Sequence, residues 1–537
     1  MEVSYREEGV ASAASSVAGR LVADGVPARL AAGDPPLWGE DAEREAAVRL
    51  GWLTLPRYSR ELLPVLGGLV ERARAAGLTN VVLAGMGGSS LAAEVICATA
   101  DVPLTVLDTT DPGQVRRALA EQFDATVVVV SGKSGSTVET DSLLRIYEQL
   151  FTDAGLDPAG RVVVVTDPGS PLDKRAVEAG YDLVLAQPDV GGRFSALSAF
   201  GLVPSALAGA DVARLLDEAG EVLPLLSRDT GNPGLDLGAA LGGAALAGRD
   251  KLLLEDQLSA ITGLPDWIEQ LVAESTGKQG RGILPVVGAD PNESGDELVV
   301  AIETDVGDVR VDGPLGAQFL VWEYATALAG LLLEINPFDQ PNVAESKENT
   351  AALLALPDLP VGAPSFVDGP VEVYGAATAR DLPGLFAEVL NAIPADGYLS
   401  ITAFLDRLAA FDAPVPDGAD FEQMTDAWMM ADPATLRALL ALRTNRPVTF
   451  GWGPRFLHST GQYHKGGPQN GVFLQITGAV AEDVAVPGRP YTLGRLQLAQ
   501  ALGDLGALET RGRPAVRLHL TDRAAGVARL LAAAQEA

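Results

Sequence analysis

The sequence is poor in the residues that build disulfides and zinc sites. It contains one cysteine, Cys97, and three histidines among 537 residues. A single cysteine excludes an intrachain disulfide and fits a reducing compartment. So few nitrogen and sulfur ligands argue against zinc. The 71 acidic residues leave an oxygen-ligated Mg²⁺ or Mn²⁺ open, but they form no tight cluster. We therefore expect no metal.

Positive charge is also scarce, and no long apolar run is free of charge. The formal net charge of −32 argues against binding to nucleic acids or anionic membranes, although local donors in a cleft can still hold a small anion. The most apolar stretch, FLVWEYATALAGLLLEI, contains Glu323 and Glu334 and predicts a buried helix rather than a membrane span. The start, MEVSYREEGV, lacks an apolar signal core. We expect a cytoplasmic protein.

Short runs of valine and leucine alternate with helical patterns from about residue 60 onward. The runs are NVVLAG (80–85), PLTVLD (103–108), ATVVVVSG (125–132), RVVVVTD (161–167) and DLVLA (182–186). Continuous apolar runs are typical of strands buried on both faces, and their alternation with helices predicts a parallel sheet. Ligands bind such sheets beyond the carboxyl ends of the strands.

The chain divides into four predicted segments. Residues 1–60 look helical, residues 61–215 hold the first α/β unit, and residues 216–357 hold a second, with KLLLE (251–255), ELVVAIE (297–303) and a long helix over 315–335. The proline-rich stretch 355–364 is the best linker. Residues 358–537 form a further α/β region, whose strands are predicted at YLSITAF, PVTFGW, NGVFLQITG and AVRLHLTD.

The third of the early strands runs into the turn SGKSGSTVET (131–140). Ser136 and Glu139 fit a capping box, and an amphipathic helix follows. Ser134, Ser136 and Thr137 would then lie at a helix N-terminus, which attracts anions, although Ser136 as a simple cap explains the pattern equally well. A nucleotide phosphate loop needs glycine where Val127 stands, and a nucleophile elbow needs glycine at Ser136, so neither motif fits.

Two other glycine turns follow strands. GMGGSS (85–90) contains Gly88 and Ser89 and could be a dinucleotide fingerprint with Asp108 as ribose partner, but its sixth position is serine. GGRFSALSAFG (191–201) carries Arg193, for which a solvated surface position is the alternative to a functional one. Donor-rich turns at neighbouring strand ends suit one compact phosphate better than a dinucleotide.

These segments together resemble the glucose-6-phosphate isomerase family. The likeness lies in VVLAGMGGSSLAAEV, VVVVSGKSGSTVET and GGRFSALSAFGL, in WIEQLVAESTGKQGRGILP (267–285) and in NPFDQPNVAESKEN (336–349). It covers roughly residues 60–350 and is similar above all to the isomerase portion of fused transaldolase–isomerase proteins. The resemblance implies two sugar-phosphate-isomerase (SIS) subdomains with flavodoxin-like parallel sheets flanked by helices, plus an additional C-terminal α/β segment.

The resemblance also implies roles for single residues. The phosphate would lie against Gly88 and Ser89 in one turn and Lys133, Ser134, Ser136 and Thr137 in the other. Glu274 would be the base, with Lys347 and Arg193 beside it and Gln270 and Gln340 contacting the sugar. Gln270 and Glu274 are four residues apart and so share a helix face. Pro341 suits a first helical position, which would make Gln340 the N-cap and place Lys347 two turns further on.

The chain departs from the family pattern in its histidine. The family's catalytic histidine lies between the glutamate and the lysine, but here PRFLHSTGQYHKGG (454–467) carries the matching segment after both. We assign the role to His458, because catalytic groups can converge in space in any chain order. The alternative is a structural His458. We read His464 and Lys465 as flanking loop residues.

The implied activity is the interconversion of glucose 6-phosphate and fructose 6-phosphate through ring opening and a cis-enediol, without a cofactor. A bifunctional phosphoglucose/phosphomannose isomerase and a non-catalytic sugar-phosphate-binding SIS protein are the alternatives, with a dehydrogenase third. A sugar phosphate is the expected partner, and the family implies a homodimer.

Overall fold

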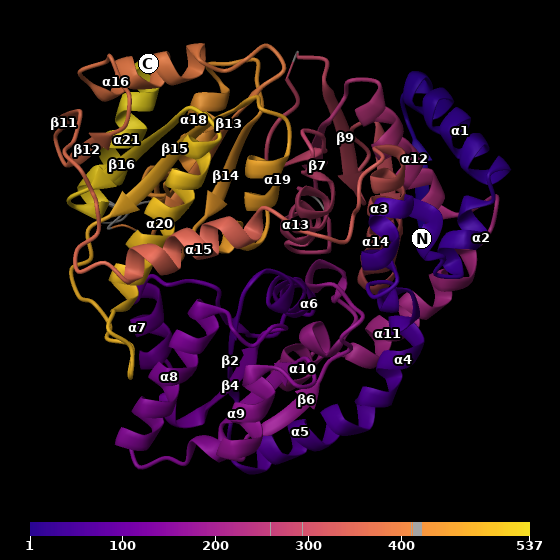
Figure 1. Cartoon of the computed structure of the whole chain (residues 1–537), viewed down its shortest axis with the longest axis horizontal. Coiled ribbons are helices and arrows are strands. Elements are labelled where there is room, and N and C mark those ends of the chain that lie inside the picture. The colour runs from indigo at the N-terminus through magenta and orange to yellow at the C-terminus, as the bar shows by residue number, and fades with distance from the viewer. Residues whose placement is uncertain (258, 293, 410, 412–420) are drawn as a thin grey trace.

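The computed structural model describes residues 1–257, 259–292, 294–409, 411 and 421–537. Three sheets succeed one another along the chain (Figure 1). The first lies at the bottom of the view, the second at the upper right, and the third at the upper left in orange and yellow. The fold is α/β with helix-flanked parallel sheets, as expected.

The first sheet has the order β3-β2-β4-β5-β6, and every pair in it is parallel. This is the flavodoxin-type order, in which the first strand has the second on one side and the third on the other. All five strands were expected from their runs of valine and leucine; β2, β4 and β5 are almost wholly buried, whereas the edge strand β6 is only partly buried. The bounds are β2 Asn80–Gly85, β3 Thr105–Leu107, β4 Thr126–Ser131, β5 Val162–Thr166 and β6 Asp182–Leu185.

The second sheet, β1-β10-β9-β7-β8, repeats this order in its parallel part. Its edge strand β1 comes from the N-terminal segment that was expected to be helical and pairs antiparallel with β10. The bounds are β1 Glu2–Tyr5, β7 Lys251–Glu255, β8 Leu284–Val287, β9 Glu297–Ile302 and β10 Val309–Asp312.

The third sheet has the order β11-β12-β16-β15-β13-β14. Its parallel part, β14-β13-β15-β16, shows the same strand order once more, and β12 joins it antiparallel to β16. The bounds are β11 Phe366–Asp368, β12 Val371–Tyr374, β13 Tyr398–Phe404, β14 Val448–Trp452, β15 Gly471–Gly478 and β16 Ala515–Leu520. No helix or strand interrupts the predicted linker at 355–364.

The helices cover the sheet faces and fill the junctions between the sheets (Figure 1). Those before and around the first sheet are α1 Glu8–Ala23, α2 Val26–Ala31, α3 Glu40–Ala46, α4 Leu55–Tyr58, α5 Leu63–Ala75, α6 Leu91–Thr99, α7 Pro112–Ala120, α8 Val138–Asp153, α9 Pro171–Ala179 and α10 Ala199–Ala208. The second sheet has α11 Val212–Val222, α12 Pro233–Leu246, α13 Leu264–Thr276, α14 Leu315–Leu332 and α15 Val343–Leu354. The third has α16 Leu382–Asn391, α17 Phe421–Met429, α18 Thr435–Ala441, α19 Gly461–Gly466, α20 Leu493–Thr510 and α21 Arg523–Glu536.

One described helix, α14, is long and apolar enough to cross a membrane by length and composition alone. It is a core helix, because 89% of that stretch is buried inside the protein. Its Glu323 is fully buried, and burial raises the pKa of that carboxyl well above its ordinary value. The expectation of a buried helix is confirmed.

Two helices begin later than the sequence predicted. The N-cap of α8 is Thr137 rather than Ser136, and its side chain makes no capping bond. The proposed capping box is therefore wrong, because Glu139 directs its carboxylate to His458 instead of the backbone. Helix α15 begins at Val343 with Asn342 as N-cap, so Gln340 lies in the preceding turn.

The cores indicate how the segments associate. One hydrophobic cluster is continuous over the first two sheets and the N-terminal helices, whereas the third sheet has a separate cluster. Helices α15 and α20 pack on one another between these regions. The domain limits 61–215, 216–357 and 358–537 follow the sheets, and we keep them as a proposal.

Candidate active site

The glycine turn after β2 packs against two distant backbone segments. Gly87 has φ +54°, and a Cβ there would lie 2.7 Å from both the His458 carbonyl oxygen and Gln270 Nε2. A Cβ on Gly88 would lie 2.0 Å from the Gly192 carbonyl oxygen. Because these positions are glycines, the turn after β2 can lie directly against the segment that carries His458 and the segment that carries Arg193. The sequence had suggested a close approach to a ligand, but the approach observed is to the protein itself.

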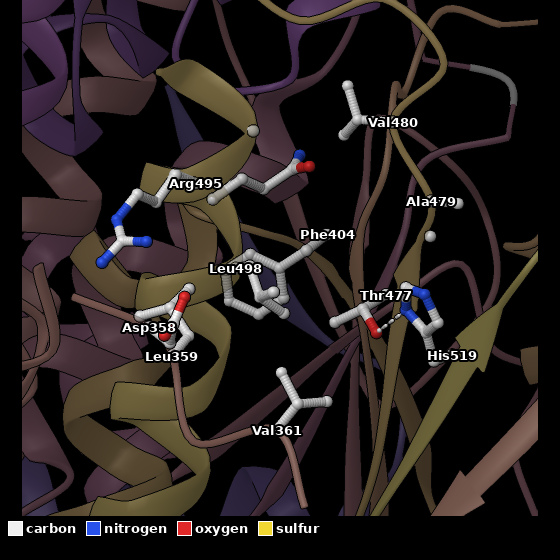
Figure 2. Close-up of a pocket in the computed structure, with 13 residues that line it drawn as sticks. Asp358, Leu359, Val361, Phe404, Thr477, Ala479, Val480, Arg495, Leu498 and His519 are labelled. Carbon is white, nitrogen blue, oxygen red and sulfur yellow. Dashed lines mark hydrogen bonds between the residues drawn. The ribbon is translucent and has the colours of Figure 1, made fainter. Parts of the chain in front are cut away.

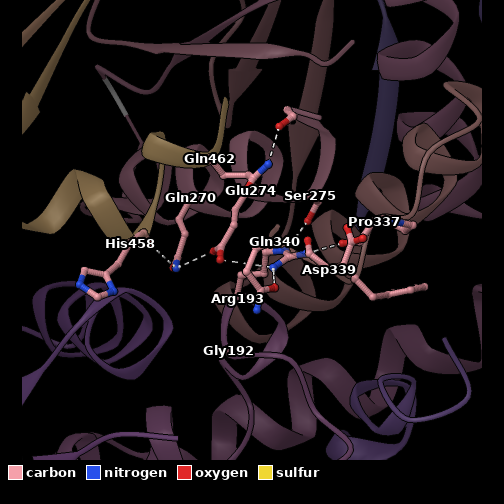
Figure 3. Close-up of polar contacts among 12 residues, drawn as sticks. Gly192, Arg193, Gln270, Glu274, Ser275, Pro337, Asp339, Gln340, His458 and Gln462 are labelled. Carbon is pink, nitrogen blue, oxygen red and sulfur yellow. Dashed lines mark hydrogen bonds and ion pairs between the residues drawn. The ribbon is translucent and has the colours of Figure 1, made fainter. Parts of the chain in front are cut away.

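Helix α13 joins the predicted base to the histidine segment. Gln270 Nε2 donates to Glu274 Oε2 at 3.2 Å and to the His458 carbonyl oxygen at 2.8 Å. Figure 3 shows this chain of contacts, with the His458 imidazole pointing away from Gln270. The predicted shared face of Gln270 and Glu274 is confirmed, and both side chains are buried.

Arg193 is buried rather than solvated, with 2% of its surface exposed. Its Nε donates to Ser275 Oγ at 2.7 Å and its Nη1 to Gln340 Oε1 at 3.0 Å. Nη1 also lies 3.4 Å from Glu274 Oε1. Burial lowers the pKa of the guanidinium, and the charges of Glu274 and Asp339 oppose that shift. The arginine thus lies directly against the predicted base (Figure 3).

The same arginine holds the turn that follows α14. Its Nη2 donates to the carbonyl oxygens of Pro337 at 2.6 Å and Asp339 at 3.0 Å. Arg193 therefore donates four hydrogen bonds, and Nη1 has in addition only the ion-pair contact with Glu274. A substrate oxygen can bind this guanidinium at Nη1, beside Glu274.

A second buried cation, Lys278, holds this turn from the other side. Its Nζ donates to the Asn336 carbonyl at 2.7 Å and to the Asp339 carbonyl at 2.6 Å, and it lies 2.7 Å from Asp339 Oδ1. Burial and the neighbouring Arg193 lower the pKa of the Lys278 ammonium to about 8. Sequence reasoning quoted this lysine within ESTGK but gave it no role.

A cavity of about 200 Å³ opens at His458, but Glu274, Arg193, Gln270, Gln340 and Gly88 are not among the residues that line it. Its wall is formed by the end of the serine turn, the first residues of α8, one face of α15 and the histidine segment. The predicted residues among its lining are Ser136, Thr137, Lys347 and His458. The structure therefore brings these four together, although they are drawn from three separate parts of the chain.

Two lining residues that form the polar contacts behind His458, Glu139 and Gln500, were not predicted as site residues. His458 Nε2 lies 3.0 Å from Glu139 Oε1, and Gln500 Nε2 donates to the same oxygen at 2.7 Å. Burial alone would raise the pKa of Glu139, but the charge and hydrogen bond of His458 lower it below its ordinary value. The buried carboxylate fixes the orientation of the His458 ring through this hydrogen bond.

Several expected contacts are absent from the cavity. Lys133 lies in the right loop, but its Nζ is 2.6 Å from Asp167 Oδ2 and it does not line the cavity. Ser134 reaches it only through the Ser136 hydroxyl, at 3.1 Å. Ser89 is buried in the glycine turn and is likewise not among the lining residues.

The dinucleotide alternative loses its ribose partner. Asp108 is 1% exposed and Arg455 Nε lies 2.7 Å from its Oδ2, so this carboxylate is engaged inside the protein.

His464 and Lys465 also differ from expectation. They belong to α19 and are buried: His464 lies against Tyr398, and Lys465 pairs with Asp504 at 2.5 Å. They are structural residues, not loop residues.

The arrangement suits proton transfer on a small anionic molecule. One carboxylate, Glu274, lies beside a fixed guanidinium, and one imidazole, His458, is backed by a second carboxylate. A lysine and a helix N-terminus provide positive potential in the cavity that His458 lines, whereas Glu274 and Arg193 lie outside that lining. Among the described residues no group of three or more histidine, cysteine or acidic side chains is placed to hold a metal.

Comparison with known proteins relates the chain to glucose-6-phosphate isomerases. No protein-family model matches the chain. A glucose-6-phosphate isomerase of Rubrobacter xylanophilus is 31% identical over 389 residues, which are 57% of this chain and 89% of that protein. A probable glucose-6-phosphate isomerase of Natronomonas pharaonis is 31% identical over 344 residues, covering 57% and 79%. The crystal structure of a hypothetical protein of Thermus thermophilus superposes with a TM-score of 0.54 at 26% identity, covering 65% of this chain and 98% of that one.

Proposed function

The chain belongs to the glucose-6-phosphate isomerase family, and from that premise we propose that it interconverts glucose 6-phosphate and fructose 6-phosphate in the cavity at His458. The observation that carries the assignment of residues is the continuous contact chain Glu139–His458–Gln270–Glu274. It runs through the main-chain carbonyl of His458, so it holds the histidine segment against α13, while the imidazole contacts Glu139.

In this proposal the phosphate lies at the serine turn. Ser136 and Thr137 line the cavity at the N-terminus of α8, where backbone N–H groups and the helix dipole favour an anion. Lys347 is exposed on α15 at the cavity wall and adds a positive charge. Ser134 supports Ser136 through their hydroxyl contact. Binding energy at the phosphate then orients the sugar against the acid–base groups.

Ring opening is assigned to His458. An imidazole can move a proton between the ring oxygen and the adjacent hydroxyl, and the Glu139 carboxylate stabilises the charged ring during that transfer. Lys347, on the same cavity wall, assists. We expect His458→Ala to lose activity on glucose 6-phosphate but to keep it on erythrose 4-phosphate, which is open-chain.

Isomerisation is assigned to Glu274. Its carboxylate would take the C2 proton and return it at C1 through a cis-enediol, while the buried Arg193 stabilises the developing negative charge. The enediolate oxygen would bind Arg193 at Nη1, where the present contact with Glu274 is an ion pair at 3.4 Å. This added bond makes the stabilisation specific to the reacting state.

The assignment is tested with Glu274→Gln. We expect loss of glucose 6-phosphate isomerisation by about 1,000-fold or more, with binding of a sugar-phosphate inhibitor retained. Glu348→Gln, an exposed carboxylate of α15, is the matched control and stays active. Full activity of Glu274→Gln would overturn the assignment of the base.

The alternatives are separated by substrate. Conversion of mannose 6-phosphate at a comparable rate would favour the bifunctional isomerase, and binding of sugar phosphate without turnover would favour a non-catalytic protein. Binding of NAD would favour the dehydrogenase. The likeness to transaldolase fusions, the homodimer and the cytoplasmic location also stay proposals. Sedimentation of the purified chain tests the homodimer.

A further inference from the structure

A second cavity, of about 410 Å³, lies at the carboxyl edge of the third sheet (Figure 2). Its wall includes the ends of three parallel strands at Phe404, Thr477 and His519. The segment after α15 and the first turns of α20 complete it. Its volume falls within the usual range of small-molecule pockets, about 300–1,000 Å³. None of its lining residues belongs to the candidate active site.

The strand order of the third sheet makes this position an expected place for a ligand. In the third sheet β13 has β14 on one side and β15 on the other, so the direction of the connections reverses between β13 and β15. Open α/β sheets bind ligands at the carboxyl ends of the strands at such a reversal. Phe404 ends β13 and Thr477 lies at the end of β15, so the cavity occupies that point. The serine turn of the first sheet follows β4 at the equivalent place.

A buried positive charge, Arg517, lies behind the residues that line the cavity and is not itself part of the lining. Arg517 is 1% exposed, and its guanidinium lies 3.8 Å over the Tyr374 ring. Its Nη1 donates to Thr477 Oγ1 at 3.3 Å and its Nη2 to the Val361 carbonyl at 3.4 Å, while its Nε has no hydrogen-bond partner among the described residues. Thr477 and Val361 both line the cavity.

No ion pair compensates this arginine within the described part of the chain. The charge of Glu372 acts on it, but that carboxylate accepts its hydrogen bond from the Tyr374 hydroxyl. Burying a cation without a hydrogen-bonded carboxylate is unfavourable, and an anion in the adjoining cavity would relieve that cost.

The hydroxyl of Thr477 connects Arg517 to His519 by hydrogen bonds. Thr477 Oγ1 lies 3.0 Å from His519 Nδ1. The hydroxyl oxygen has two lone pairs, so it can accept from Arg517 and from His519 Nδ1–H together, which leaves the hydroxyl hydrogen for a molecule in the cavity. At the opposite side of the cavity, across Phe404 and Leu498, lies the exposed carboxylate of Asp358 (Figure 2).

We propose that this cavity binds a small organic anion, with its phosphate or carboxylate at Thr477 and His519 and a hydroxyl group toward Asp358. The apolar side chains between the two ends contact the body of the molecule. This anion site does not depend on the isomerisation proposed above, although helix α20 contributes residues to both cavities. Gln497 lines this cavity, and Gln500, one turn further along α20, holds Glu139 in the other.

The three histidines of the chain provide a direct assay. His519 reports this cavity, His458 the candidate active site and His464 the buried interior. We would label histidine with ¹³C, assign the three imidazole signals with His519→Gln and His458→Asn, and titrate inorganic phosphate, citrate and 3-phosphoglycerate. Inorganic phosphate tests the charge alone, citrate the carboxylates, and 3-phosphoglycerate both groups with a hydroxyl.

We expect 3-phosphoglycerate or citrate to shift the His519 signal saturably, with a dissociation constant below about 1 mM, while His464 stays unmoved. Thr477→Val weakens that binding at least about 10-fold. Thr449→Val is the matched control, because Thr449 lies in the same sheet outside the cavity and its hydroxyl has no partner in the described residues. If Thr477→Val fails to fold, Val361→Asp places a competing carboxylate on a loop and has the same expected effect.

Two results would overturn the proposal. One is a His519 signal that no probe moves up to about 10 mM, including the case in which only His458 shifts. The other is a shift that Thr477→Val and Val361→Asp both leave unchanged.

Discussion

Glu139 and His458 are 319 residues apart in the chain and lie 3.0 Å apart in the structure, measured from Oε1 to Nε2. Glu139 belongs to the first turn of α8, directly behind the serine turn, whereas His458 comes from the region of the third sheet. The contact therefore joins the phosphate end of the cavity to the histidine. It also explains how a histidine that follows the lysine in sequence takes its place in the site.

The first prediction concerns this pair. Glu139→Gln keeps the shape but removes the charge that stabilises imidazolium, so we expect about a 100-fold loss of kcat on glucose 6-phosphate. Activity on the open-chain erythrose 4-phosphate falls much less, because that substrate needs no ring opening. Steady-state kinetics on both substrates measures the difference. Equal losses on the two would show that the pair does not act in ring opening.

The second prediction concerns Arg193. A lysine has three donors for the oxygens that Arg193 now binds, so Arg193→Lys leaves acceptors in the 337–340 turn without partners. We expect a loss of about 2–4 kcal/mol in the free energy of unfolding and about 100-fold in kcat/KM. Arg281→Lys, an exposed arginine bound to the Leu333 carbonyl, serves as control and changes little. An Arg193→Lys variant as stable and active as the control would contradict this account.

The third prediction tests the glycine turn. Gly88→Ala places a methyl group 2.0 Å from the Gly192 carbonyl oxygen, which forces the two backbone segments apart. We expect a loss of about 2–3 kcal/mol and of most activity. Gly192→Ala meets no atom within 4 Å and is the matched control on the other side of the same contact. Melting temperatures and activities of the two variants decide whether the turn needs glycine for packing.

The fourth prediction follows from Lys278. Burial lowers its pKa from the ordinary 10.5 to about 8 in the folded protein. Between pH 8 and 10.5 the unfolded chain therefore holds more protons, and the free energy of unfolding rises with pH. The gain approaches about 1.4 kcal/mol per pH unit from this residue, or about 3 kcal/mol over the window.

Lys278→Met removes this contribution, so its denaturation midpoint rises less steeply with pH than that of the wild type over the same window. Comparing the two slopes cancels the titration of other groups. Parallel slopes would mean that Lys278 titrates normally in the folded protein.

Local patterns predicted the parts of the structure that depend on neighbours in sequence. The valine-rich runs of the first sheet became strands because an apolar run of that length is stable only when buried on both faces. Gln270 and Glu274 share a face because four residues make about one helical turn. The parallel sheets also followed from the alternation of strands and helices.

The sequence did not predict, or predicted wrongly, the roles of residues whose partners lie far away in the chain. Glu139 lies three positions after Ser136, a spacing that satisfies a capping box, while its true partners His458 and Gln500 come from the other end of the chain. The short strand β1 pairs with β10 more than 300 residues later, so nothing nearby distinguishes it. Lys133 appears ideal in its loop, but Asp167 at the end of the next strand pairs with it.

The central claim is that Glu274 moves a proton between C2 and C1 in a site that His458 completes. The most direct measurement is the exchange of the C2 hydrogen of glucose 6-phosphate with solvent deuterium, followed by NMR in the wild type and in Glu274→Gln. The account predicts deuterium incorporation at C2 by the wild type and none above background by Glu274→Gln. This difference should hold even when the enzyme is concentrated enough to bind nearly all of the sugar. Incorporation at a similar rate by both proteins would contradict it.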